Sequence, residues 1–179
     1  MIPECKKDSC IRAVIKQPFF LLKQIHENSC WASVLSMMFS WKEEKIISEE
    51  NILSPYNEYL EVYKNSDKAG ITFKQEVALY QKLGLETEKQ LNPTIKSWVE
   101  MIDTYGPLSI TIDARPPFGT IHAILILAIY GNENGLDTKV TYADPADGAI
   151  HEMDFLTFIK MYESKYSVDW PIQIIHFQK

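Results

Sequence analysis

Apolar positions in the first half of the chain recur every three or four residues, which is the spacing of amphipathic helices. This spacing predicts helices over Cys30–Trp41, Thr72–Gly84 and Asn92–Gly106. Thr72 and Gln75 form a capping-box pattern at the start of the second helix. Pro93 would take the first helical position of the third. The first helix is apolar around most of its circumference, so we expect it to be buried on most sides.

The period changes in the second half, where short β-branched or apolar runs are separated by proline, glycine and asparagine. These runs predict strands over Leu108–Ile112, Ile121–Tyr130, Lys139–Ala143 and Pro171–Phe177. Gly131–Gly135 is a hairpin-type loop, so the second and third strands are expected to pair antiparallel. Asp154–Tyr162 has the pattern of one more helix before the last strand. Helices followed by an antiparallel sheet indicate an α+β fold of two facing halves.

The composition is that of an ordinary globular protein, with 46% hydrophobic and 23% charged residues in 179. No repeat or Gly/Ser/Pro-rich linker divides the chain, so we expect a single domain over residues 1–179. The net charge of -6 offers no basic surface, so neither nucleic acid nor a membrane is an expected partner. The longest apolar run, Ile121–Tyr130, is about half as long as a transmembrane helix.

The three cysteines, Cys5, Cys10 and Cys30, are an odd number and follow no zinc-ligand spacing. They imply neither a disulfide framework nor a structural metal, and at least one thiol should be free. No cofactor is expected. Cys5 and Cys10 lie in a polar segment that we expect to be loose, and we assign them no catalytic role. The N-terminus lacks a secretory signal pattern, so the protein is expected to be cytoplasmic when it is made.

Cys30 stands where the helical pattern begins, near the positive end of the helix dipole, which favours a thiolate. A cysteine beside a tryptophan is also typical of a small buried hydrophobe. Gln24 precedes it by a short segment and could aim its amide at the same point as the Cys30 backbone N–H. Two donors that converge beside a nucleophile form an oxyanion hole. Trp31 either shields this site or is a core residue.

His122 opens a strongly apolar strand, where a polar ring is costly unless it is hydrogen-bonded or takes part in chemistry. Asp144 ends the next predicted strand, and pairing across the hairpin would bring its carboxylate to His122 and orient the imidazole. Both residues also have a structural interpretation, because buried polar groups are usually paired and Asp-Pro is a common turn. Phe118 precedes His122 in a proline-containing loop and either lines a substrate cleft or connects strands. Three further histidines are poorer candidates: His26 within the supposed turn, His151 in a polar loop and His176 in the last strand.

The combination of these residues resembles the active site of papain-like cysteine peptidases. Gln24 followed by Cys30-Trp31-Ala32 is similar to the segment that carries the oxyanion-hole glutamine and the nucleophile. The run from Gly106 to Ala114 resembles the strand before the catalytic histidine, and His122 with its apolar successors resembles the histidine strand.

Three departures from papain make the chain more similar to the compact bacterial branch, which includes bacteriocin-leader peptidases and avirulence-type effector proteases. Glu27 stands where papain-like enzymes usually have a cysteine. His122 follows Cys30 at a shorter interval than the roughly 130–150 residues of papain and the cathepsins. Asp144 before proline replaces their asparagine.

The resemblance implies a papain-like fold in which a central helix carries the nucleophile at its head and packs on an antiparallel sheet. Cys30 would attack a peptide carbonyl, with His122 moving the proton and Asp144 fixing the ring. Gln24 would help to hold the oxyanion. We expect a protein or peptide substrate, a role as a toxin or effector delivered into another cell without a signal peptide, and a protective inhibitor or immunity protein. A deamidase or acyltransferase with the same triad, and a catalytically silent peptide-binding module, stay open.

Overall fold

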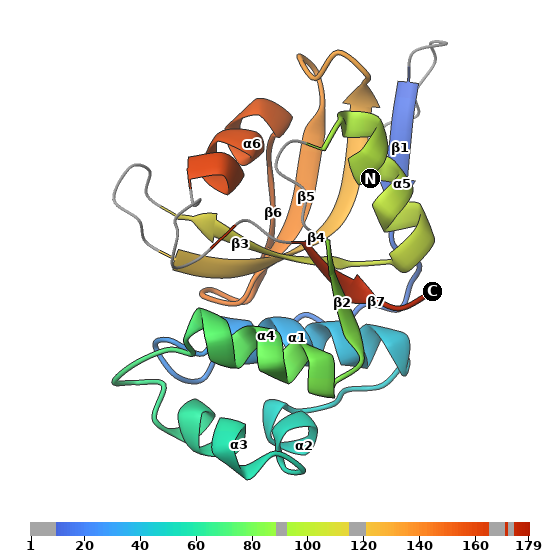
Figure 1. Cartoon of the computed structure of the whole chain (residues 1–179). Coiled ribbons are helices and arrows are strands. Elements are labelled where there is room, and N and C mark those ends of the chain that lie inside the picture. The colour runs from blue at the N-terminus through green and yellow to red at the C-terminus, as the bar shows by residue number, and fades with distance from the viewer. Residues whose placement is uncertain (1–9, 89–92, 115–120, 165–170, 172–173) are drawn as a thin grey trace.

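The computed structural model describes residues 10–88, 93–114, 121–164, 171 and 174–179. It confirms the α+β expectation, because a layer of helices packs against a seven-stranded antiparallel sheet (Figure 1). The helices are α1 (Cys30–Lys42), α2 (Glu49–Leu53), α3 (Asn57–Lys64), α4 (Phe73–Lys82), α5 (Ile95–Tyr105) and α6 (Phe155–Ser164). The strands are β1 (Cys10–Val14), β2 (Leu85–Glu88), β3 (Leu108–Asp113), β4 (Ile121–Asn132), β5 (Lys139–Asp144), β6 (Ala149–Asp154) and β7 (Ile174–Phe177).

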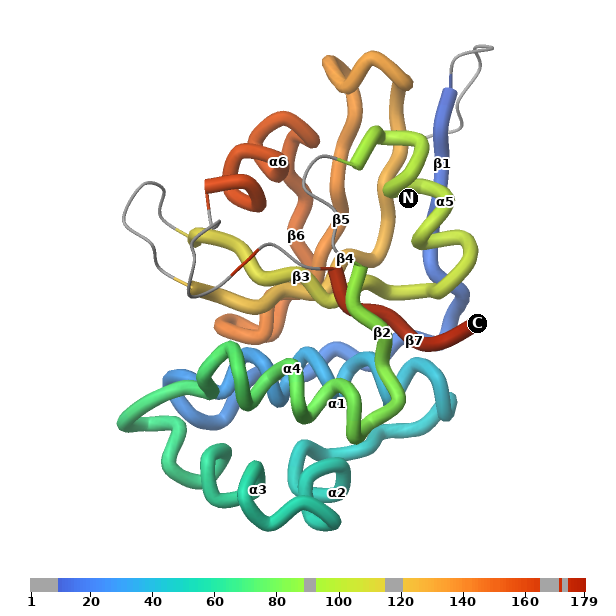
Figure 2. The backbone as a smooth tube through the Cα atoms, viewed as in Figure 1, coloured from blue at the N-terminus to red at the C-terminus, as the bar shows by residue number. Residues whose placement is uncertain are grey.

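The chain passes between the two layers more than once, as the tube in Figure 2 shows. It leaves β1, runs beneath the sheet into α1, and builds α2, α3 and α4 before it returns to the sheet through β2 (Figure 2). α5 and α6 lie above the sheet in Figure 1, away from α1 and α4. The strand order is β2-β7-β3-β4-β5-β6, with β1 also paired to β4.

Helix α1 is the buried centre of the helical layer. Every residue from Trp31 to Met38 is buried, and the helix packs directly against β4. Its serines are tolerated there because they are hydrogen-bonded: Ser33 donates to the Glu49 carboxylate at 2.8 Å, and Ser36 donates to the Ile47 carbonyl. The prediction that this helix is buried on most sides is confirmed.

Strand β4 organises the sheet, and its central residues are buried on both faces. One of its edges pairs first with β3 and then with β1, as the pairs Leu108↔Ile126 and Val14↔Ala128 show. The other edge pairs with β5 across the predicted hairpin. Helices cover both faces of the sheet here, with α1 on one side and α5 on the other, which explains why this stretch is a continuous apolar run and not an alternating one.

Several boundaries differ from the sequence prediction. α4 has the predicted capping box at Thr72, with both reciprocal hydrogen bonds present. α5 begins at Ile95 and not at Pro93, because the Thr94 hydroxyl accepts a hydrogen bond from the Ser97 backbone N–H and so caps the helix there. Asn92, the start predicted from the sequence, lies outside the described residues.

Three strands and two helices were not predicted: β1, β2, β6, α2 and α3. Cys10 opens β1 and is disulfide-bonded, so the expectations of a loose segment and of no disulfide are wrong for this residue. An odd number of cysteines requires one free thiol but sets no limit on bridges among the others, and Cys30 is a free thiol. Cys5 lies outside the described residues. His151 lies in β6 and not in a loop, because β6 pairs with β5 as the last strand at that side of the sheet.

None of the helices in the described parts of the chain has the length and apolar character needed to cross a membrane.

Candidate active site

A cleft of about 610 Å³ lies where the head of α1 meets one edge of the sheet. The helical side contributes Gln24, Cys30 and Trp31 to its lining. The sheet contributes His122 and Asp144. The structure therefore brings together the three predicted catalytic residues, the predicted oxyanion-hole residue and one of the two predicted cleft aromatics. Phe118, the other aromatic, lies outside the described residues.

Strand pairing accounts for the meeting of His122 and Asp144. β4 and β5 are antiparallel neighbours with Leu125 opposite Ala143, so the first residues of β4 and the last residues of β5 lie side by side at the same end of the two strands. There His122 Nε2 and Asp144 Oδ1 lie 2.7 Å apart. The same carboxylate oxygen accepts a hydrogen bond from the Ala146 backbone N–H at 2.8 Å. This second bond fixes the orientation of the carboxylate that in turn orients the imidazole.

The Cys30 thiol is the other side-chain hydrogen-bond partner of His122. Since Nε2 is engaged with Asp144, the ring nitrogen left for the sulfur is Nδ1. Burial alone would lower the pKa of His122, but the hydrogen bonds to Asp144 and Cys30 outweigh it and raise this pKa to about 10. Burial acts to raise the pKa of Asp144, yet the bond to His122 and the Ala146 N–H leave it below its usual value. An imidazolium placed between a carboxylate and a sulfur favours a thiolate nucleophile.

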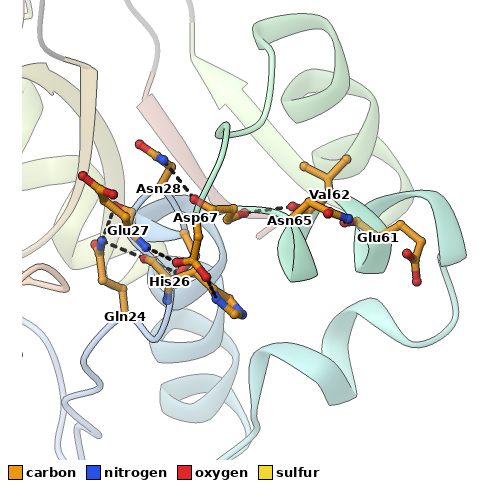
Figure 3. Close-up of polar contacts among 10 residues, drawn as sticks. Gln24, His26, Glu27, Asn28, Glu61, Val62, Asn65 and Asp67 are labelled. Carbon is orange, nitrogen blue, oxygen red and sulfur yellow. Dashed lines mark hydrogen bonds and ion pairs between the residues drawn. The ribbon is translucent and has the colours of Figure 1, made fainter.

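The Gln24 side chain reaches the cleft but is already hydrogen-bonded there (Figure 3). Its Nε2 donates to the carbonyls of His26 at 3.0 Å and Glu27 at 2.6 Å. Its Oε1 is buried and has no hydrogen-bond partner among the described residues. The backbone N–H of Gln24 donates to the Pro145 carbonyl at 2.8 Å, which ties this segment to the turn after Asp144. An oxyanion would therefore have to compete with a backbone carbonyl for one amide N–H.

Trp31 is 3% exposed, and its indole N–H has no partner among the residues that the structure describes. The side chain both lines the cleft and belongs to the core.

Glu76 is a further cleft residue, and the sequence analysis missed it. It lies in the first turn of α4 with an exposure of 1%, and its Oε1 accepts a hydrogen bond from the Tyr80 hydroxyl at 2.5 Å. Burial and the neighbouring Glu76 charge together raise the pKa of Tyr80 well above its usual value. A glutamate in the first turn of a capped helix is a common dipole-stabilising residue, so the sequence carries no signal for its burial.

The other three histidines are not part of the His122–Asp144 pair. His26 binds Asp67 at 3.0 Å, His151 binds Asp147 at 2.8 Å, and His176 is fully buried in β7. Among the described residues, no group of three or more His, Cys, Asp or Glu side chains is arranged to hold a metal ion.

Comparisons with known proteins agree with this geometry. A family model described as "Papain-like cysteine protease AvrRpt2" matches residues 15–165. The chain belongs to this family of papain-like cysteine proteases. The protease is also similar in fold to the peptidase domain of Streptococcus ComA, a bi-functional ABC transporter involved in a quorum sensing pathway. That match has 18% identity and a TM-score of 0.54, and covers 90% of this chain and 100% of the other. A comparison with curated proteins found no match.

Proposed function

We propose that the protease is an endopeptidase with a Cys30–His122–Asp144 triad and an oxyanion hole that includes Gln24. The observation that carries the proposal is the continuous chain of side-chain contacts in the cleft, from the Cys30 thiol through the His122 ring to the Asp144 carboxylate. A nucleophile, a base within hydrogen-bonding reach and a third group that orients the base are the parts that thiol acyl transfer requires.

In the proposed mechanism, the Cys30 thiolate attacks the carbonyl carbon of the scissile peptide bond and forms a tetrahedral oxyanion. The His122 imidazolium gives its proton to the departing amine, which leaves a thioester between Cys30 and the acyl part of the substrate. His122 then takes a proton from water as the water attacks the thioester. Collapse of the second tetrahedral species releases the carboxylic acid and restores the thiolate and imidazolium.

Gln24 contributes to the oxyanion hole by exchanging partners. One of its amide N–H groups leaves a backbone carbonyl as the oxyanion forms, while the backbone N–H of Cys30 supplies the second donor. The first N–H groups of an α-helix have no partner within the helix, so the Cys30 N–H at the head of α1 suits this role. The exchange strengthens binding to the transition state, because a charged oxygen is a better acceptor than a carbonyl.

The test combines a covalent probe with a substrate. A peptidyl chloromethyl ketone should label the wild type at Cys30 and should not label Cys30→Ala or His122→Ala, as intact mass would report. Denatured casein should be cleaved into fragments by the wild type alone. A gain of about one mass unit on casein glutamines without cleavage would replace the peptidase by a deamidase, because the two reactions share the acyl-enzyme. Absence of labelling at Cys30 in the folded wild type would overturn the triad.

We further propose that the protease acts as a toxin or effector inside a cell other than its producer, and that an inhibitor or immunity protein restrains it beforehand. Support comes from the resemblance to avirulence-type effector proteases. Expression of the wild type in a recipient cell should cleave specific proteins and impair growth, and the Cys30→Ala variant should do neither. A recipient proteome that is identical with either form would contradict this role.

A further inference from the structure

The segment from Gln24 to Ser29 has no regular secondary structure but is densely hydrogen-bonded. Ser29 Oγ donates to the His26 carbonyl at 3.0 Å and accepts from the His26 N–H at 3.2 Å. The Gln24 amide binds the His26 and Glu27 carbonyls on the cleft side. The position of Gln24 Nε2 is therefore set by the directions of these two carbonyls.

Each of those carbonyls belongs to a peptide unit whose N–H is held from the opposite side. The His26 carbonyl shares its unit with the Glu27 N–H, which donates to Asp67 Oδ1 at 3.0 Å. The Glu27 carbonyl shares its unit with the Asn28 N–H, which donates to the Ser66 carbonyl at 2.9 Å. A trans peptide is planar with its N–H and C=O pointing in opposite directions, so fixing the N–H fixes the carbonyl.

The turn that holds the two N–H groups is itself anchored to α3, as Figure 3 shows. Asn65 Nδ2 donates to the Glu61 carbonyl at 2.8 Å, and Ser66 Oγ donates to the Val62 carbonyl at 2.9 Å. Asp67 follows directly and also binds the His26 ring through Oδ2 at 3.0 Å. Its carboxylate thus makes two contacts with the segment before Cys30.

We propose that Asp67 is a positioning residue for the oxyanion hole, because it holds the His26–Glu27 peptide unit on which the Gln24 amide rests. The inference builds on the proposed peptidase function and adds a residue outside the cleft to it. Asp67 does not itself line the cleft, and it reaches Gln24 only through the His26–Glu27 peptide unit. Hydrogen bonds from the Glu27 N–H and His26 lower the pKa of Asp67, so its carboxyl group is ionised at neutral pH.

Removal of the Asp67 carboxylate should loosen Gln24 without disturbing the thiol. In Asp67→Ala the Glu27 N–H loses its acceptor, and the peptide unit is held only through its carbonyl, by Ser29 and Gln24. In Asp67→Asn the side-chain oxygen still accepts from this N–H, so a smaller effect is expected. Glu61→Ala is the matched control, because Glu61 is an exposed carboxylate on the same anchor, with Lys64 as its ion-pair partner.

The experiment compares two reactions of Cys30 that differ in their need for the oxyanion hole. Iodoacetamide alkylates the thiolate without forming an oxyanion. Acetyl-dipeptide aldehydes add to the thiolate and form a tetrahedral oxygen that the hole binds. A set of acidic, apolar and basic aldehydes is screened, and the one that best protects Cys30 from iodoacetamide is used. Intact mass follows the protection, which gives the affinity for the aldehyde without a known substrate.

Asp67→Ala should weaken aldehyde protection about 10-fold while the alkylation rate stays the same, since small displacements of a positioned group cost factors of this order. Asp67→Asn should weaken it less, and Glu61→Ala not at all. In a Gln24→Ala background, Asp67→Ala should have no further effect, because two residues that act through one contact are not additive. Thermal unfolding establishes that each variant is folded, and Asp67→Asn carries the test if Asp67→Ala is not.

Additive losses in the Gln24→Ala background, unchanged protection in Asp67→Ala, or an equal slowing of alkylation would each overturn the positioning role. Failure of the proposed function gives a different pattern. In that case wild-type Cys30 would react no faster than Cys30 in His122→Ala, and no aldehyde of the set would protect it.

Discussion

The two sides of the cleft position their functional groups by different means. On the sheet side, His122 and Asp144 stand at the ends of neighbouring strands, and the ladder of backbone hydrogen bonds between these strands sets their separation. On the helical side, Gln24 lies in an irregular segment whose shape depends on individual polar side chains. A ladder tolerates most side-chain changes, because its bonds join backbone atoms. An irregular segment does not, so distant residues such as Asp67 acquire influence over the site.

This difference predicts different responses to mutation. Changes on the sheet side should alter the protonation of the catalytic pair and leave the geometry intact. Changes on the helical side should alter geometry and leave protonation intact. Alkylation of Cys30 reports the first property, and binding of aldehydes or turnover of casein reports both.

The largest effect is expected for His122→Ala, which removes both the proton carrier and the positive partner of the sulfur. Casein cleavage should fall by about 10⁴-fold or more, because loss of the nucleophile or of the base alone costs about as much as loss of the whole triad. Alkylation of Cys30 at neutral pH should slow as well. His151→Ala is the matched control, since its ring lies on β6 and binds Asp147. A variant that keeps a tenth of the wild-type activity would contradict the assignment of His122 as the base.

Gln24→Ala should produce the next largest effect, and it should change the geometry of the oxyanion hole without changing the protonation of Cys30 and His122. Loss of one oxyanion donor costs about 10²–10³ in turnover, and the lower value is expected because this amide gives up a carbonyl contact to act. The Cys30 alkylation rate should not change. Gln81→Ala, an exposed glutamine of α4, controls for the substitution itself. Equal losses of turnover and alkylation would mean that Gln24 supports the thiol and not the oxyanion.

Asp144→Asn should act on protonation more than on turnover. The amide oxygen can still accept from Nε2, so we expect a fall in casein cleavage of about tenfold, but the negative charge that supports the imidazolium is gone. The pKa of His122 should drop from about 10. The imidazolium would then lose its proton at a lower pH, so the high-pH limb of casein cleavage, which needs that proton for the departing amine, should shift to lower pH. Asp147→Asn is the control, and an unmoved limb in Asp144→Asn would contradict the coupling.

The same contrast explains how much of the structure could be predicted from the sequence. The helix of Cys30 and the strands of His122 and Asp144 were predictable, because each has a long periodic or apolar run. The proposed catalytic residues stand at the ends of these elements, and the hairpin between the two strands brings His122 and Asp144 together. β2, with the sequence LETE, has no such run, and it forms only because β7 pairs with it. Such a strand depends on contacts that are distant along the chain.

The side-chain contacts on the helical side of the cleft could not be predicted from the sequence either. His26 and Asp67 are 41 positions apart, and no local pattern links them. Glu76 and Glu49 are buried, although charged residues in helix first turns usually face solvent. The disulfide of Cys10 was also missed, because cysteine spacing alone does not determine pairing. Side-chain contacts between distant segments were thus the part that sequence patterns could not reach.

The smallest effect on the reaction is expected from Ser33→Ala, which tests whether any damage to the helical layer reaches the site. Ser33 and Glu49 are both buried, and the variant leaves the Glu49 carboxylate without this donor. An unpaired buried acceptor should cost about 2 kcal/mol and lower Tm by about 5 °C. The contact lies on the side of α1 facing α2 and not in the segment before Cys30, so aldehyde protection and alkylation should match the wild type. Ser54→Ala, whose hydroxyl is exposed, should change neither Tm nor reaction. Weakened aldehyde protection in Ser33→Ala would mean that the oxyanion hole depends on the stability of the whole helical layer. The local contacts of the segment before Cys30 would then not be what distinguishes the helical side from the sheet side.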